Sequence, residues 1–198
     1  ELEGVNATGG INGHKVEVIL LDDECKPDKG IANVNRFIHQ QKVHLVVGST
    51  CSSVTIPMVD ITAKEEVPQI TPQSSSGAVT KKNSAWIFRT SVSERFYAAV
   101  HAKYLAENVG KKVAYLYTTD AAGISFARDY MAYMRKTYNI EPVFEAQMQE
   151  TDLDFRANLL KIKAMNPDVL AIGGQADAIA RITAQSYEVG IPSRVRRV

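Results

Sequence analysis

The sequence has few of the residues that build metal centres or catalytic dyads. It contains two cysteines, Cys25 and Cys51, and four scattered histidines among 198 residues. Two thiols cannot supply a four-thiolate zinc site, and no histidine lies at metal-ligand spacing from them. The acidic stretch "LLDDECKPD" at 20–28 offers carboxylates to a cation, but the turn at 26–28 favours an exposed loop. We expect no metal site, and we interpret the histidines as surface or edge residues.

Charge of one sign and long apolar runs are also lacking. The chain has 23 basic and 22 acidic residues, interspersed, for a net charge of +1. This balance gives no support for a nucleic-acid partner. No apolar run approaches the roughly 18 residues that cross a bilayer, so we expect no membrane span. No signal peptide is present, but the opening "ELEGVNATGGING" is typical of a helix end and turn, so this says little about destination.

Strand and helix patterns alternate along the chain, and 45% of the residues are hydrophobic, enough for a normal core. Nearly continuous apolar runs indicate strands whose two faces are both covered. The predicted strands are 15–21, 43–48, 67–71, 86–90, 112–118, 141–147 and 168–173. The predicted helices are 29–41, one from 53–55 with Pro57 in its first turn, 91–108, 122–137, one capped by Asp152 or Asp154 and ending at 166, and 176–189.

Such alternation predicts an α/β fold built from parallel βαβ units. We expect two doubly wound parallel-sheet lobes, with the break near 89–93, where extended chain gives way to a helix. A capping box of Ser91 and Glu94 is predicted to open that helix, which carries Phe96, Val100, Tyr104 and Leu105. The expected domains are therefore a first lobe at 1–92 and a second lobe at 93–198.

Ligands of open α/β sheets bind beyond the carboxyl ends of the strands. That rule selects four loops rich in small or polar residues: 48–53, 71–77, 118–123 and 173–177. The alternative for each loop is ordinary turn chemistry, since Ser, Gly and Asp are common where a strand becomes a helix. If the loops act together, the polar loops of two lobes line one shared site.

The first loop, "GSTCSS" at 48–53, carries no recognisable catalytic motif. It lacks the second glycine of a nucleophile elbow, the Gly-Lys-Ser/Thr of a phosphate loop and the dinucleotide fingerprint. A helix N-terminus with free N–H groups and hydroxyls does suit an anion. A ligand carboxylate could accept hydrogen bonds from the hydroxyl and N–H of Ser52 and from a serine of 74–76. We therefore predict binding without chemistry: no enzyme, no catalytic residue and no cofactor.

Cys25 and Cys51 each lie just past a predicted strand. If those two strands are near neighbours in the sheet, the thiols can meet. A disulfide there would close a loop of moderate size and would imply an oxidising compartment.

With these features, the sequence resembles the branched-chain amino-acid binding proteins of ABC importers, which are type I periplasmic solute-binding proteins. The strongest matches are "NATGGINGHKVEVILLDDECKPDKGIANVNRFI", "VVGSTCSSVTIPMVDI", "VPQITPQSSSG" and "IFRTS". Weaker matches are "TTDAAGISFARDY", "DFRANLLKIKAMNPDVLAIGG" and "AQSYEVGIP". The paired cysteines in "DDEC" and "GSTCSS" are the most specific element, and in the family they form a disulfide.

The resemblance implies a ligand held between two lobes that close on a hinge, then passed to a membrane permease. It implies that Ser52, with Ser53 and Ser74 beside the site, binds the ligand carboxylate through its hydroxyl and N–H. It implies that Ser75 contacts both the carboxylate and the ammonium, and that the backbone carbonyl of Gln73 accepts from the ammonium. A periplasmic or other extracytoplasmic location follows. The alternative is a ligand-sensing domain of the same fold in a receptor or regulator.

The resemblance also shows where this chain departs from the family. Ala122 and Gln175 stand where the family usually has tyrosines. The room at Ala122 favours a larger ligand, such as an aromatic acid, and Gln175 could meet a polar group. The family's ammonium-pairing carboxylate falls beyond Val198, and nothing in the sequence assigns that role to Asp120 or Asp177.

The resemblance further implies a fold that is incomplete at both ends. The family's first strand, most of its first helix and its last C-terminal elements are not in this chain. The first strand is central in a doubly wound sheet, so we expect a gap in the first sheet.

Overall fold

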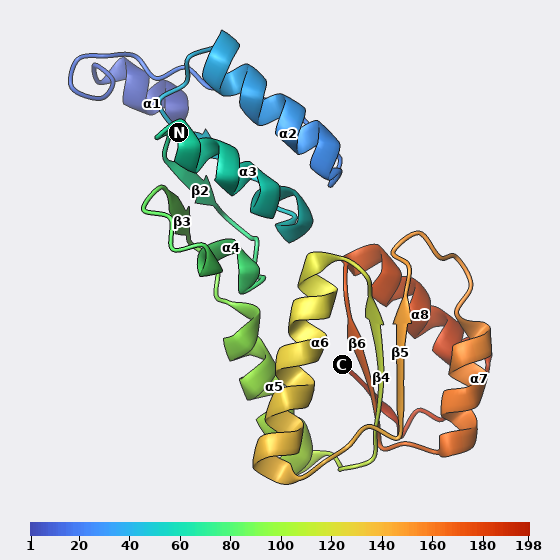
Figure 1. The fold of residues 1–198 in the computed structure, drawn as a ribbon. Coiled ribbons are helices and arrows are strands. Elements are labelled where there is room, and N and C mark those ends of the chain that lie inside the picture. The colour runs from blue at the N-terminus through green and yellow to red at the C-terminus, as the bar shows by residue number, and fades with distance from the viewer.

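A computed structural model describes residues 1–198 and confirms the α/β fold with two parallel sheets (Figure 1). The first sheet has the order β1-β2-β3, formed by Val46–Val47, Gln69–Thr71 and Ile87–Arg89. Its helices are α1 (Leu2–Ala7), α2 (Pro27–Asn35), α3 (Ser52–Lys64) and α4 (Ala78–Lys81), and the π-helical turn η1 (Arg36–Gln40) extends α2. None of the chain's helices combines the length and apolar composition of a membrane span.

The second sheet has the order β5-β4-β6-β7, and all its strand pairs are parallel. Its strands are β4 (Val113–Thr118), β5 (Phe144–Met148), β6 (Val169–Gly173) and β7 (Arg196–Arg197). Its helices are α5 (Glu94–Asn108), α6 (Ala121–Tyr133), α7 (Arg156–Met165) and α8 (Ala176–Glu188), with the π-helical turn η2 (Met134–Tyr138) after α6. The chain passes from the first sheet to the second between β3 and α5.

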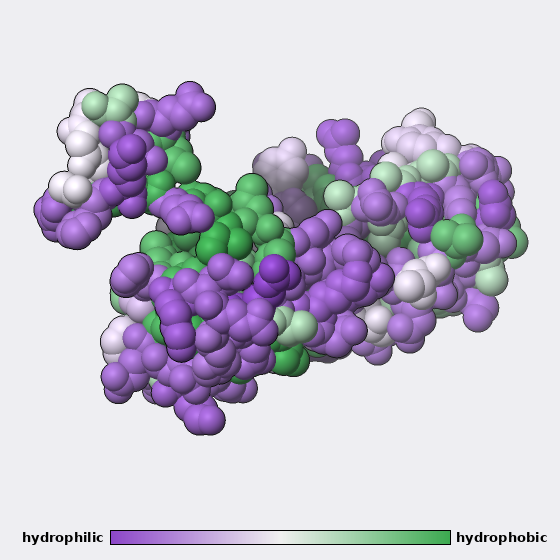
Figure 2. Space-filling model, turned by 90° about the horizontal axis from the view of Figure 1, so that it is seen from above, coloured by the Kyte–Doolittle hydropathy of each residue, from purple (hydrophilic) through white to green (hydrophobic).

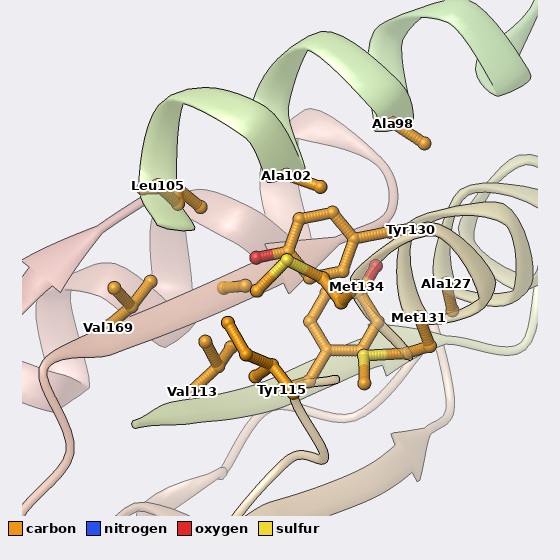
Figure 3. Close-up of a cluster of buried hydrophobic side chains, with 12 residues drawn as sticks. Ala98, Ala102, Leu105, Val113, Tyr115, Ala127, Tyr130, Met131, Met134 and Val169 are labelled. Atoms are coloured by element: carbon orange, nitrogen blue, oxygen red, sulfur yellow. The ribbon is translucent and has the colours of Figure 1, made fainter. Parts of the chain in front are cut away.

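The second sheet is covered on both faces, which explains its continuous apolar strands. One core cluster joins β4 and β6 to α5 and α6, and a second joins β4, β5 and β6 to α7 and α8. In the first cluster the rings of Tyr115 and Tyr130 stack with centroids 5.3 Å apart, beneath the small side chains Ala98 and Ala102 (Figure 3). Fully burying a side chain such as Leu105 or Met134 contributes about 1.5–3 kcal/mol, whereas the hydroxyls of Tyr115 and Tyr130 are buried without a hydrogen-bond partner.

The apolar residues predicted along α5 do not all enter this core. Leu105 is fully buried, but Phe96, Val100 and Tyr104 are 59%, 70% and 53% exposed. The face that packs is the one with Ala98 and Ala102, because only small residues let α6 approach closely. The larger residues four positions apart form a separate stripe that the core does not cover.

Three predicted helix starts are wrong. α3 begins at Ser52, so Pro57 is its sixth residue and lies in the second turn, where its missing N–H costs an internal hydrogen bond. α5 is capped by Ser93 rather than Ser91, and no side chain makes a capping hydrogen bond there. α7 has Phe155 as its N-cap, because Asp154 accepts from the Arg156 N–H (3.0 Å) in a local turn instead.

The strand predicted at 15–21 is also wrong. The segment has no strand assignment, and residues 17–21 make no backbone hydrogen bond. A strand needs a neighbour to pair with, and the strands of the first sheet pair only with each other. A groove of about 910 Å³ lies between this segment and β1, lined by Val16, Val18, Ile19, Phe37 and Val46 among others. Apolar surface gathers in a furrow on this side of the molecule (Figure 2).

The contact between α2 and α3 depends on a glycine, which leads to a first prediction. Gly30 is buried, and a methyl group added there would overlap Cγ1 of Val54. Gly30→Ala gains roughly 1 kcal/mol of helix propensity but costs roughly 1–3 kcal/mol by overpacking. We expect a net loss of about 1 kcal/mol in the free energy of unfolding. Urea denaturation measures it.

Gly4→Ala is the matched control, because Gly4 lies in α1 with no atom near the added methyl. That variant should be as stable as the unmodified protein or more so. Equal effects at the two glycines would contradict the packing argument.

Candidate ligand-binding site

The two serine-rich loops of the first sheet lie at the same edge. They follow β1 and β2, which are parallel neighbours, so the carboxyl ends of both strands meet there. The loops are joined directly, because the backbone N–H of Ser76 donates to Oγ of Ser52 at 3.2 Å. Ser52 is 2% exposed and opens α3. The structure therefore brings the predicted residues Ser52 and Ser75 to one place.

Several buried hydroxyl groups hold these two loops together. The carbonyl oxygen of Ser49 lies within hydrogen-bonding distance of the hydroxyls of Thr55 (3.0 Å), Thr71 (2.7 Å) and Ser74 (3.0 Å). The Ser74 hydroxyl also lies 2.7 Å from that of Thr55, and Ser74 is fully buried. Of the predicted site residues, Ser74 thus has a side chain already engaged inside the protein, and its backbone N–H donates to Oγ1 of Thr71 at 3.2 Å.

The start of α3 presents donors with no partner in the chain. The N–H groups of Ser52 and Ser53 belong to the first turn and make no hydrogen bond. Oγ of Ser52 accepts from Ser76, so its own proton is available to an external acceptor. These donors and the positive end of the helix dipole suit a carboxylate.

The loop after β2 presents acceptors. Gln73 is exposed, and its backbone carbonyl makes no hydrogen bond within the chain. Oγ of Ser75 is hydrogen-bonded to the Glu94 carboxylate, and the Glu94 N–H donates to the Ser75 carbonyl at 2.9 Å. The Arg89 guanidinium donates to the carbonyls of Ser75 (3.2 Å) and Ser76 (2.9 Å). Residues at the crossing between the sheets therefore hold this loop in place.

Glu94 is a buried acid, only 9% exposed. Burial raises the pKa of its carboxyl above the usual value, and the nearby Asp120 and Asp129 carboxylates add to the rise. The Ser75 hydroxyl and Arg89 lower the pKa of Glu94, but by less. A cation that approaches Glu94 therefore stabilises the charged form of its carboxyl group.

The predicted residues of the second sheet lie around the start of α6. Asp120 caps this helix, accepting from the N–H groups of Ala122 (3.0 Å) and Gly123 (3.1 Å) and from the Thr118 hydroxyl. Nε2 of Gln175 donates to the same carboxylate at 3.4 Å. Ala122 and Gln175 thus belong to one cluster, and Asp120 is fully engaged in holding it.

Besides the Ser75–Glu94 contacts, a hydrogen bond to α6 links the two halves of the site. The Gly77 N–H, in the loop after β2, donates to Oγ of Ser125 on α6 at 3.3 Å. α4 lies beside the upper end of α6 (Figure 1). The loops of both sheets therefore approach each other where the ligand was predicted.

The two cysteines form the disulfide that the resemblance implied. Cys25 and Cys51 are bonded, with Cα atoms 5.6 Å apart, a normal separation for such a bond. Cys51 is the N-cap of α3, directly before Ser52, so the bond also fixes the start of the helix that carries the anion donors. The carboxylates beside Cys25 are used locally, since Glu24 pairs with Lys26 and Lys29.

Sequence reasoning missed Glu94 and Arg89 as parts of this site. Glu94 was interpreted as a cap because the spacing Ser-x-x-Glu fits that local motif. Arg89 lies at the end of a predicted strand and gave no separate signal. The available clue was their position in the sequence. Arg89 and Glu94 lie on either side of the boundary between the lobes, where the hinge was expected.

Comparisons with known proteins identify relatives of this chain. The sequence profile of a family described as "Periplasmic binding protein" matches residues 2–198. The chain belongs to the periplasmic binding protein family. An amino acid binding protein of Pseudomonas aeruginosa is 32% identical over 193 residues, which cover 97% of this chain and 51% of that protein. The chain spans about half the length of the curated relatives it matches.

Solved structures of this family have the same fold. The branched-chain amino acid transporter substrate binding protein LivJ from Streptococcus pneumoniae, in complex with isoleucine, superposes with a TM-score of 0.85 at 27% identity. That match covers 96% of this chain and 54% of the other. A solute binding protein of an ABC transporter from R. palustris, in complex with 4-hydroxybenzoate, superposes with a TM-score of 0.88. That structure is 18% identical to this chain, and the match covers 99% of this chain and 54% of the other, so it shows the fold alone. The resemblance to branched-chain amino-acid binding proteins is confirmed.

Proposed function

We propose that this chain is part of an extracytoplasmic solute-binding component of an ABC importer. Its ligand is an amino acid or a related small carboxylate, bound between a first lobe at 1–92 and a second lobe at 93–198. The permease of the importer is the expected partner. The observation that carries the proposal is the start of α3, where the hydroxyl and N–H of Ser52 and the N–H of Ser53 are free beside Ser75.

The binding roles divide between two kinds of group. Ser52 and Ser53 donate to the ligand carboxylate, while the Gln73 carbonyl and Ser75 take the amine when the ligand has one. Ala122 and Gln175 face the ligand from the second lobe, where the small alanine leaves room for a larger side chain. The LivJ structure with bound isoleucine supports an amino acid as a candidate, and the room at Ala122 keeps an aromatic acid as another.

The disulfide supports the location outside the cytoplasm. Structural disulfides form and persist in oxidising compartments and are rare in the cytosol. Cys25 and Cys51 are both used in one bond, and the chain has no free thiol.

A thermal-shift screen of the intact protein tests the proposal. Amino acids and aromatic acids are added singly, and a ligand at about 100 times its Kd adds about 2.7 kcal/mol to the stability of the folded state. We expect at least one compound with a free carboxylate to raise the Tm, while the corresponding amide or ester does not. If no carboxylate in the panel raises the Tm, the proposed function is wrong.

A further inference from the structure

The hydroxyl of Ser75 has a restricted role because of its partner. A serine hydroxyl carries one proton, and an ionised carboxylate can only accept. Oγ of Ser75 is hydrogen-bonded to Oε1 of Glu94, so the proton of Ser75 points to Glu94 whenever that residue is charged. The remaining lone pairs of Oγ can then only accept. The Ser75 hydroxyl is thereby suited to an ammonium group and unsuited to a carboxylate.

Glu94 itself has no cationic partner. Its carboxylate makes one hydrogen bond, to Ser75, and no lysine, arginine or histidine forms an ion pair with it. Arg89, whose charge acts on Glu94, directs its guanidinium to two backbone carbonyls instead. Buried charges in proteins are normally paired. An acid that is 9% exposed and unpaired therefore marks a place for a cation.

Asp120 provides the contrast. It is as buried as Glu94, but both of its oxygens are occupied by backbone and side-chain donors at the start of α6. Asp120 therefore has a structural role as a helix cap. Glu94, the first residue of α5, retains an oxygen, Oε2, without a hydrogen bond, and its partner Ser75 lies on the loop that also holds the free Gln73 carbonyl.

We propose that Glu94 is the positioning residue that makes this site select a ligand with an ammonium group beside its carboxylate, an α-amino acid rather than the corresponding acid without the amine. Glu94 accepts a hydrogen bond from the Ser75 hydroxyl, which leaves the Ser75 oxygen able only to accept a hydrogen bond from the ligand. Glu94 also supplies a negative charge next to that hydroxyl. The inference rests on the proposed function and narrows its ligand class. It also assigns the Ser75 hydroxyl to the amine alone, whereas the sequence predicted that Ser75 contacts both ends of the ligand.

The electrostatic surroundings agree with this role. Burial and the carboxylates of Asp120 and Asp129 oppose ionisation of Glu94, so its pKa is raised, and only Ser75 and Arg89 favour the charged form. A bound ammonium group also favours the charged form of Glu94. A ligand without an amine leaves the charge of Glu94 uncompensated and adds a second negative charge nearby.

The test compares matched ligands by calorimetry on the intact protein. L-leucine is paired with 4-methylpentanoate and L-phenylalanine with 3-phenylpropanoate, so the members of each pair differ only in the amine. We expect the unmodified protein to bind an amino acid more tightly than its partner acid. Glu94→Gln should weaken binding of the amino acid at least about tenfold, while affinity for the acid without the amine stays within about twofold or rises.

Two further variants separate charge from structure. Glu94→Asp keeps the charge and should restore part of the preference for the amine. Glu107→Gln, on the same helix, removes an exposed carboxylate whose one hydrogen bond is to Tyr138, and it should leave both affinities unchanged. Circular dichroism confirms that each variant is folded.

The outcomes distinguish this inference from the proposed function. An equal loss for both members of a pair in Glu94→Gln would show a purely structural role and overturn the inference. So would an unmodified protein that binds the acids without the amine and not the amino acids, although carboxylate binding would then stand. If no member of either pair binds and the wider carboxylate screen is also negative, both proposals are wrong.

Discussion

Loss of the Cys25–Cys51 disulfide should lower the free energy of unfolding of the first lobe by roughly 3 to 4 kcal/mol. The bond closes a loop of sequence separation 26, and without it the unfolded chain regains the entropy of that loop. The effect is large because the first sheet has only three short strands. A Cys25→Ala/Cys51→Ala double variant avoids leaving a thiol at position 51, which is 5% exposed.

Urea denaturation followed by circular dichroism measures this loss. Because the protein has two sheets, the transition of the first is to be separated from that of the second. Reductant should destabilise the unmodified protein to a similar extent and leave the double variant unchanged. A difference below about 1 kcal/mol would mean that the reduced chain is already constrained in its unfolded state.

Replacing Ser52 by alanine should weaken ligand binding by about 1 to 3 kcal/mol, the cost of leaving a charged acceptor short of a donor. The same change removes the acceptor of the Ser76 N–H, so the loop after β2 also loses a link to α3. Isothermal calorimetry on the intact protein, with the tightest carboxylate from the thermal-shift screen, measures the change in Kd.

Ser193→Ala is the matched control for this experiment. Ser193 is exposed, and its side chain makes no hydrogen bond in the structure, so its loss should leave the affinity unchanged. Unchanged affinity in Ser52→Ala would remove Ser52 from the site. It would also remove the main support for carboxylate recognition at the start of α3.

Much of the fold could be predicted from the sequence because its elements are locally encoded. The apolar strands at 113–118 and 169–173 and the helices that follow them were expected within a few residues of their observed bounds. The segment 15–21 has an equally apolar pattern and still forms no strand. Periodicity indicates that a segment is able to pair, but it carries no information on whether a partner is present.

The candidate site could be predicted in part for the same reason. Ser52 was found because a strand, a small polar loop and a helix follow each other in the chain. Glu94 was missed because its decisive contact, with Ser75, joins residues 19 positions apart, while the local motif suggested a cap. Ser74 looked like its neighbours in sequence, and only packing shows that its hydroxyl points inward to Thr55 and Ser49.

The unpaired segment 17–21 and the outer side of β1 have a consequence for handling this chain. β1 bonds to β2 on one side only, so the backbone groups of Leu45 and Val47 remain open on the other, and Val47 is 68% exposed. Exposed strand edges of this kind act as templates for other polypeptides. We therefore expect the isolated chain to self-associate through this edge of β1 at high concentration.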